Sequence, residues 1–186
     1  MIQPAYRIEN KEEVNTEPKG ASKLLGKEMP RDPRKVEKRI IEPDSRYNSV
    51  MLSQFINKIM LNGKKSVARK LVYGAMDKIQ EQIKTDPLEV FETAVKNVSP
   101  QVQIKSRRIG GATYQVPIEV KANRKIHYAF SWIRDAARNR KGKPYDICLA
   151  EEIMDAYNNT GTAIKKKEDT HKMAEANKAF AHFARY

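Results

Sequence analysis

The 186-residue sequence predicts a mainly α-helical protein, a single domain of about six helices with a protruding two-stranded β-ribbon between the third and the fourth. Two observations support this prediction. From residue 44 onward, apolar residues recur every three or four positions, as on the buried face of a helix. Between residues 101 and 120 the period shortens to two, which is typical of a half-buried strand. We therefore expect a helical domain over residues 34–186. Residues 1–33 are polar and charge-balanced, which predicts a flexible extension.

The first two helices are marked by their boundary residues. Asp44 or Ser45 can cap a helix that ends near Leu61, before Asn62-Gly63. The second helix begins at Lys64-Lys65, and two lysines at this end oppose the helix dipole. Local stability does not favour this arrangement, whereas free backbone N–H groups beside two cations suit a phosphate. The apolar stripe of the second helix is expected at Val67, Leu71, Ala75, Ile79 and Ile83.

The third helix and the ribbon have the clearest local signals. Asp86 is the expected N-cap and Pro87 the first helical residue, while Pro100 ends the helix. In the ribbon over residues 101–120, Gly110-Gly111 supplies the positive φ of a tight hairpin turn. The alternating apolar positions of the ribbon are Val102, Ile104, Tyr114, Val116, Ile118 and Val120.

Three cations, Lys105, Arg107 and Arg108, stand just before the turn of the ribbon. Each arm has about nine residues and could extend about 30 Å. Such an arm with a basic tip suits contact with a polyanion. The alternative is an ordinary edge hairpin whose cations prevent aggregation. An isolated hairpin is marginally stable in water, so we expect the ribbon to lean on helices or on a partner.

The last three helices carry more cations. The fourth is expected from a cap at Asn123 to about Arg140, and a stripe of arginines lies beside its apolar face: Arg124, Arg134 and Arg138. Pro144 begins a fifth helix that ends near Asn158. The first turns of the sixth helix contain Lys165, Lys166 and Lys167. The apolar face of the sixth helix is expected at Met173, Ala176, Phe180 and Phe183.

The charge balance points to nucleic acid. Lysine and arginine outnumber aspartate and glutamate by 36 to 23, and the net charge is +13. Residues 1–33 contain six of each sign, so the whole excess lies in residues 34–186. An anionic membrane surface is a weaker alternative. A basic strap over residues 31–43 is either a solvated charge run or a segment that lies along RNA, and we favour RNA. The strap cations are Arg31, Arg34, Lys35, Lys38 and Arg39.

The sequence gives no sign of catalysis, a cofactor or a metal site. The three histidines are not spaced as metal ligands with Cys148, and no nucleophile elbow or dinucleotide fingerprint is present. Cys148 is the single cysteine, which fits a reducing compartment, and we expect a packed thiol. Trp132 is expected to serve packing more than base stacking. No apolar run reaches the roughly 20 residues of a membrane span.

Three segments resemble one family, small-subunit ribosomal protein seven in its bacterial and organellar form. They are DSRYNSVMLSQFINKIMLNGKKSVARKLVY, VQIKSRRIGGATYQVPIEV and GTAIKKKEDTHKMAEANKAFAHF. The resemblance runs from about Pro30 to Tyr186 and leaves the role of residues 1–29 open. It implies early binding to the 3′ major domain of small-subunit ribosomal RNA (rRNA) and nucleation of head assembly. It also implies a ribbon near the exit-site transfer RNA, the messenger RNA path and small-subunit protein eleven.

The resemblance assigns RNA contacts to particular residues of this chain. In the GKKS segment and the sixth helix these are Lys64, Lys65, Lys165, Lys166 and Lys167. In the ribbon they are Lys105, Arg107 and Arg108, beside the turn at Gly110 and Gly111. The strap cations and the arginines of the fourth helix rest on charge mapping instead.

Two other functions remain as alternatives. One is a nucleic-acid chaperone without sequence preference outside the ribosome, which would explain the charge but not the specific ribbon. The other is a membrane-surface binder, which needs a basic amphipathic helix with large exposed apolar groups. The acidic residues of the N-terminus argue against an organelle transit peptide, so we expect a cytoplasmic ribosome rather than an organellar one.

Overall fold

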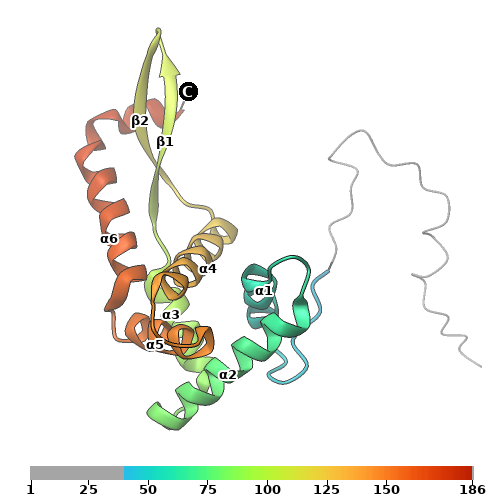
Figure 1. Ribbon diagram of the computed structural model, residues 1–186. Coiled ribbons are helices and arrows are strands. Elements are labelled where there is room, and N and C mark those ends of the chain that lie inside the picture. The colour runs from blue at the N-terminus through green and yellow to red at the C-terminus, as the bar shows by residue number, and fades with distance from the viewer. Residues whose placement is uncertain (1–39, 186) are drawn as a thin grey trace, which may run out of the picture. The chain divides into compact units, whose positions relative to one another are not determined.

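The chain folds into helices interrupted by one β-ribbon, as a computed structural model that describes residues 40–185 shows (Figure 1). The elements in order are α1 (Val50–Ile59), α2 (Lys65–Ile83), α3 (Pro87–Val98), β1 (Val102–Ile109), β2 (Ala112–Glu119), α4 (Ala122–Asn139), α5 (Tyr145–Tyr157), α6 (Gly161–Ala176) and a 3₁₀ helix, η2 (Lys178–Arg185). The predicted mainly helical fold, with the ribbon between the third and fourth helices, is confirmed.

The hydrophobic core is centred on α5, which contacts α2, α3, α4 and α6. Three phenylalanines from different helices meet inside it. The ring of Phe55 in α1 lies 5.0 Å from that of Phe91 in α3 and 5.1 Å from that of Phe130 in α4. Each buried aromatic ring contributes a large apolar area to the core. The common core therefore fixes the positions of α1, α3 and α4 relative to one another.

Helix α1 begins later than predicted. Its N-cap is Ser49, whose hydroxyl accepts a hydrogen bond from the Leu52 amide at 3.4 Å. Asp44 is instead buried, and its carboxylate accepts hydrogen bonds of 2.8 and 2.9 Å from the Tyr73 hydroxyl in α2. The prediction of a cap at Asp44 or Ser45 was wrong because Asp44 found a tertiary partner. By contrast, the Asp86 cap of α3 is confirmed, with a 3.0 Å bond to the Leu88 amide.

The apolar stripe predicted for α2 is only partly correct. Ala75 and Ile79 are buried, but Val67 is 53% exposed. Residues four apart advance about 400° around a helix, so a strict four-residue stripe drifts by about 40° at each step. The buried face alternates three- and four-residue steps instead. It consists of Ala68, Val72, Ala75, Met76 and Ile79.

Helices α4 and α6 also differ from prediction. Helix α4 starts at Ala122, and no side chain caps its N-terminus, so the expected Asn123 cap was wrong. Helix α6 ends at Ala176, and the chain continues as η2. The stripe predicted for the sixth helix is wrong at Met173 and at Ala176, since both side chains are exposed. The buried residues of α6 are Ala163, Ile164 and Ala174.

The ribbon register explains how a proline fits into β2. Ile109 pairs with Ala112 across the turn, and Gly110 and Gly111 have φ values of 57° and 90°, as a tight hairpin turn requires. In an antiparallel pair, hydrogen-bonded and non-bonded positions alternate from this closing pair. Counting inward, Pro117 opposite Ile104 falls on a non-bonded position. The missing N–H of Pro117 therefore costs the ladder nothing.

The ribbon leans on α6 and η2, which confirms the prediction that it leans on helices. In Figure 1 the ribbon extends away from the helices, with α6 alongside and η2 against β2. The ring of Tyr114 lies 5.3 Å from the rings of both Phe180 and Phe183 in η2. At the ribbon base, the Gln101 amide donates to Nε2 of His171 at 3.1 Å. The two phenylalanines predicted for a helix face thus support the ribbon.

Two classes of feature are absent from residues 40–185. No helix in this range has the length and apolar character to cross a membrane. Nor do three or more histidine, cysteine or carboxylate side chains gather there in a way that could hold a metal ion. Cys148 is buried, and its thiol donates to the Lys143 carbonyl at 3.6 Å, in agreement with a packed thiol.

Candidate nucleic-acid interface

The predicted RNA-contacting cations of the described chain lie on four elements: α2, the ribbon, α4 and α6. The strap cations lie outside the described residues, so their contact with RNA stays a prediction. They are Arg31, Arg34, Lys35, Lys38 and Arg39.

A basic cluster is formed by the end of α1 and one side of α4, and we call Lys58, Arg124, His127 and Arg134 the α1–α4 cluster. Partial burial lowers the pKa of His127, and the charges of Lys58, Arg124 and Arg134 lower it further. Burial also lowers the pKa of Lys58, followed by repulsion from Arg134. Positive groups that repel one another in this way favour the binding of an anion, which would relieve their repulsion.

Two members of this cluster, Lys58 and His127, were missed from the sequence. A signal for His127 existed, because it falls three residues after Arg124 on the stripe that carries Arg134. No such signal existed for Lys58, which lies in the last turn of α1 and meets α4 only through the tertiary fold.

The arginines of α4 have different surroundings. Arg124 is exposed. Arg134 forms an ion pair with Asp135 at 2.7 Å, which leaves part of its guanidinium for other contacts. Arg138 donates from Nη2 to the carbonyl of Ile59 at 3.1 Å, where the last turn of α1 has carbonyls without helical partners. Arg138 therefore fastens α1 to α4, whatever else it contacts.

The N-terminus of α2 is uncapped. Lys64 holds the cap position but makes no capping hydrogen bond through its side chain, and the first turn contains no acidic residue. Lys64 and Lys65 are both exposed. A helix start with free N–H groups and two adjacent cations is a suitable place for a phosphate.

The cations of the ribbon do not share one face. Cross-strand partners point to the same side of a sheet. Lys105 opposite Val116 and Arg107 opposite Tyr114 therefore lie on the side that η2 covers, and Arg108 opposite Thr113 lies on the other. Arg107 is half-buried, whereas Lys105 and Arg108 are exposed.

The apolar pattern of the ribbon divides in the same way, because Val102 and Ile104 face the opposite side from Tyr114 and Val116. A Cβ atom at Gly110 or Gly111 would meet no atom within 4 Å, so the space beside both turn glycines is open.

The three lysines of α6 also divide into two kinds. Lys165 and Lys166 are exposed, whereas Nζ of Lys167 donates to the carbonyl of Asn97 at 2.7 Å, near the end of α3. The Asn97 side chain donates in turn to the carbonyls of Ala156 and Tyr157, both at 3.1 Å. Lys167 is thus part of a polar junction between α3, α5 and α6, and only Lys165 and Lys166 are fully presented to solvent.

Trp132 is partly buried on α4. Its ring stacks on Tyr128 at 5.6 Å and packs against the core. This placement agrees with the interpretation of Trp132 as a packing residue.

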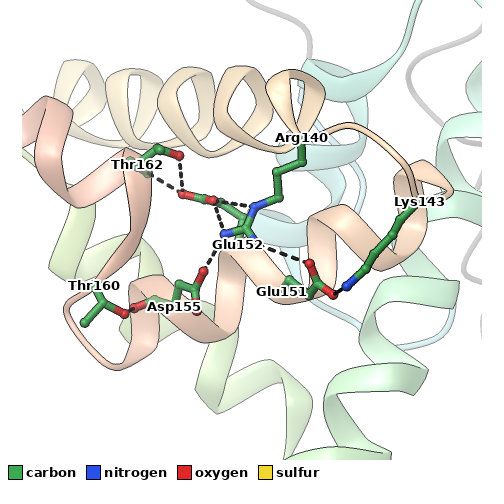
Figure 2. A network of polar contacts seen from close by, with 8 residues as sticks. Arg140, Lys143, Glu151, Glu152, Asp155, Thr160 and Thr162 are labelled. Carbon is green, nitrogen blue, oxygen red and sulfur yellow. Dashed lines mark hydrogen bonds and ion pairs between the residues drawn. The ribbon is translucent and has the colours of Figure 1, made fainter.

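A charge network holds α5 to the connection from α4 and to the start of α6 (Figure 2). Arg140 donates to Glu152 at 2.6 and 3.0 Å, to Glu151 at 3.2 Å, and to Asp155. Glu152 is fully buried and also accepts from Thr162 Oγ1 and from the Ala163 amide, at 3.1 and 2.9 Å.

Burial lowers the pKa of Arg140, but its hydrogen bonds to Asp155 and Glu152 outweigh this effect, so the pKa is raised overall. Arg140 is therefore a structural cation that holds helices together, a role that the net charge of the sequence did not reveal.

Known proteins resemble this chain over most of its length. The family described as ribosomal protein S7p/S5e matches residues 30–178. A relative from Thermotoga neapolitana, named small ribosomal subunit protein uS7, is 60% identical over 150 residues, covering 81% of this chain and 97% of the relative. Proteins of the same name from Thermotoga maritima and Chloroflexus aggregans are 59% and 56% identical over 150 residues. Each alignment covers 81% of this chain, with 97% and 96% of the relative.

Proposed function

Because the chain belongs to the ribosomal protein S7p/S5e family and is thus a structural protein of the small ribosomal subunit, we propose a specific role for it there. It binds the 3′ major domain of small-subunit rRNA and nucleates assembly of the head. Its basic faces grip several rRNA helices at once.

The α1–α4 cluster is the observation that carries this proposal. Burial and then the charges of Lys58, Arg124 and Arg134 lower the pKa of His127, and burial and then repulsion from Arg134 lower that of Lys58. Arg134 itself pairs with Asp135. Folded RNA presents a dense phosphate surface and few readable base edges in its helices. Arginines in rigid positions suit such a surface because they make forked contacts with phosphate. Specificity would then arise from shape, since only one RNA fold meets all basic faces together.

The other basic faces extend the same proposal. Lys64 and Lys65 would hold a phosphate at the start of α2, and Lys165 and Lys166 would contact RNA from α6. Lys167 and Arg138 would contribute less, because each already bonds to a helix carbonyl. Residues 34–186 would form the rRNA-binding domain, with the strap lying along RNA and residues 1–33 as an extension.

The ribbon would approach the exit-site transfer RNA and the messenger RNA path, with small-subunit protein eleven as a neighbour. The side of the ribbon that η2 does not cover, which we call its outer side, supports this assignment because it is free for such a contact. Ser106 and Arg108 lie on this outer side, opposite Gln115 and Thr113. The similarity to proteins named for the small ribosomal subunit supports a ribosomal location, and we propose that the ribosome is the cytoplasmic one.

Reconstitution of the head tests the assembly role. Small-subunit rRNA would be incubated with the other head proteins, with and without this chain, and the bound proteins quantified. We expect the other head proteins to bind the 3′ major domain poorly until the full chain is added. Equal binding in its absence would refute the nucleating role, even if the chain itself binds the RNA.

A further inference from the structure

The corner between α1 and α2 exposes apolar side chains next to cations. Leu61 is 62% exposed and Val67 is 53% exposed, and Leu71 lies beside them one turn further along α2. Together with Ile59 and Ala68 they line a hollow of about 290 Å³, which we call the corner hollow. Asn62 and Lys64 stand at its rim. Ile59 and Ala68 belong to the core, but Leu61, Val67 and Leu71 do not, although the sequence places Val67 and Leu71 in an apolar stripe.

The segment that forms the corner hollow carries charge of one sign, and Lys64 lines the hollow itself. Between Lys58 and Asp77 the sequence contains no acidic residue. It contains five cations there: Lys58, Lys64, Lys65, Arg69 and Lys70. None of them forms an ion pair with any other residue in the range 40–185. The occupant of this site must therefore satisfy an apolar surface and several positive charges at once.

An unstacked nucleotide has both properties. Its base offers a flat, weakly polar surface, and the phosphates on either side carry negative charge. The size of the hollow also favours a single base over a protein helix. A helix binding in a groove uses about three or four apolar anchors over two turns, whereas the corner hollow has two strongly exposed aliphatic side chains.

We propose that the corner hollow binds the base of one unpaired rRNA nucleotide. The base lies against Leu61, Val67 and Leu71, and the adjacent phosphates meet Lys64 and Lys65. The Asn62 amide, at the rim, can hydrogen-bond to the edge of the base. This inference rests on the proposed rRNA binding and adds to it a position where the protein contacts a base and not only the backbone.

The test compares two double variants of the full chain. Leu61→Ser/Val67→Ser removes the apolar walls, and Val50→Ser/Met173→Ser is the matched control, since Val50 and Met173 are 45% and 51% exposed elsewhere. Affinity for a 3′ major domain fragment is measured across a salt series. We expect Leu61→Ser/Val67→Ser to bind about tenfold more weakly at every salt concentration, because apolar contact is lost.

The salt dependence separates base contact from phosphate contact. Leu61→Ser/Val67→Ser should leave the log–log salt slope unchanged, whereas Lys64→Ala should reduce it by about 0.7 to 0.9. The control double variant should bind like the parent. Equal affinities of the two double variants would overturn the inference while leaving rRNA binding intact. If the parent protein itself shows no preference for the ribosomal fragment, both this inference and the proposed rRNA binding would be overturned.

A photo-crosslinking residue in place of Val67 identifies the occupant directly in assembled small subunits. We expect a crosslink that nuclease removes and that maps to one unpaired nucleotide. A crosslink to another protein, or none to RNA, would assign the corner hollow to a different partner and refute the inference.

Discussion

Replacing Arg140 tests whether its charge network stabilises the scaffold. Arg140→Met leaves the carboxylate of Glu152 buried without its main counter-charge, although Thr162 and the Ala163 amide still donate to it. Removing one partner of a buried ion pair costs about 3–5 kcal/mol. Because the Arg140 side chain is 28% exposed and two hydrogen bonds remain, we expect the lower limit, about 3 kcal/mol. Urea unfolding at neutral pH, followed by circular dichroism, measures this loss.

The matched control is Lys143→Met, which breaks the more exposed pair between Lys143 and Glu151. An exposed pair contributes about 0–1 kcal/mol, so this variant should unfold nearly like the parent. Adding Glu152→Leu to Arg140→Met should recover part of the loss, because no buried charge then lacks a partner. It should not recover all of it, since the bonds to Thr162 and Ala163 also disappear. A loss below about 1 kcal/mol for Arg140→Met would refute the reasoning, since that is the range of surface pairs.

Three further predictions concern the ribbon, α6 and a histidine. Arg108→Ala should weaken the binding of exit-site transfer RNA to reconstituted subunits more than it weakens head assembly. Arg107→Ala should do the same and should also weaken the packing of the ribbon against η2. An assembly defect as large as the loss of transfer RNA binding would contradict this division. Lys167→Met should lower the free energy of unfolding by about 1 kcal/mol, because the hydrogen bond from Lys167 to the Asn97 carbonyl is lost. Lys165→Met should leave the free energy of unfolding unchanged. Equal urea midpoints for the two variants would contradict this difference. Burial lowers the pKa of His171 below 6.5, so the contribution of His171 to stability is present above pH 6.5 and is lost as the pH falls through the lowered pKa. The urea midpoint of His171→Gln should therefore fall less steeply over that pH range than that of the parent. An equally steep fall in both proteins would contradict the assignment.

Local chemistry explains why the order of elements and the ribbon turn could be predicted from the sequence. Asp86 caps α3 through its own backbone neighbours, and Gly110 and Gly111 form the turn within four residues. Such signals need no knowledge of the rest of the chain. Asp44 has the same capping chemistry as Asp86, but it is used by Tyr73, 29 residues away. Asp44 also accepts a local bond from the Arg46 amide at 3.2 Å, so it closes a turn before α1 instead of capping the helix. The long-range bond to Tyr73 is the part that no local rule contains.

The end of α6 shows a second limit. Phe180 and Phe183 continue a helical period in sequence, yet they lie in a 3₁₀ helix that packs on Tyr114 of the ribbon. Apolar periodicity indicates that a residue is buried but does not identify the surface against which it packs.

The sequence predicted where the basic surface lies better than it predicted the role of each cation on it. Counting cations found the exposed Arg124 and Lys165, but the same count treated Arg138 and Lys167 alike. These two bond to backbone carbonyls at helix ends, which depends on how the helices meet. Lys58 joins the α1–α4 cluster for the same reason and had no signal in the sequence. Charge composition thus predicts a basic surface, and only the fold separates its binding cations from its structural ones.

The measurement that tests the central claim most directly is the affinity of the full chain for a 3′ major domain fragment of small-subunit rRNA. It would be compared with a folded RNA of equal length and unrelated sequence, across a salt series. Both RNAs should bind more weakly as salt rises, because each phosphate contact adds about 0.7 to 0.9 to the log–log slope. If several rigid basic faces recognise one RNA shape, the ribosomal fragment should keep a large advantage at high salt. Two curves that coincide throughout would contradict shape-specific binding and favour a nucleic-acid binder without preference.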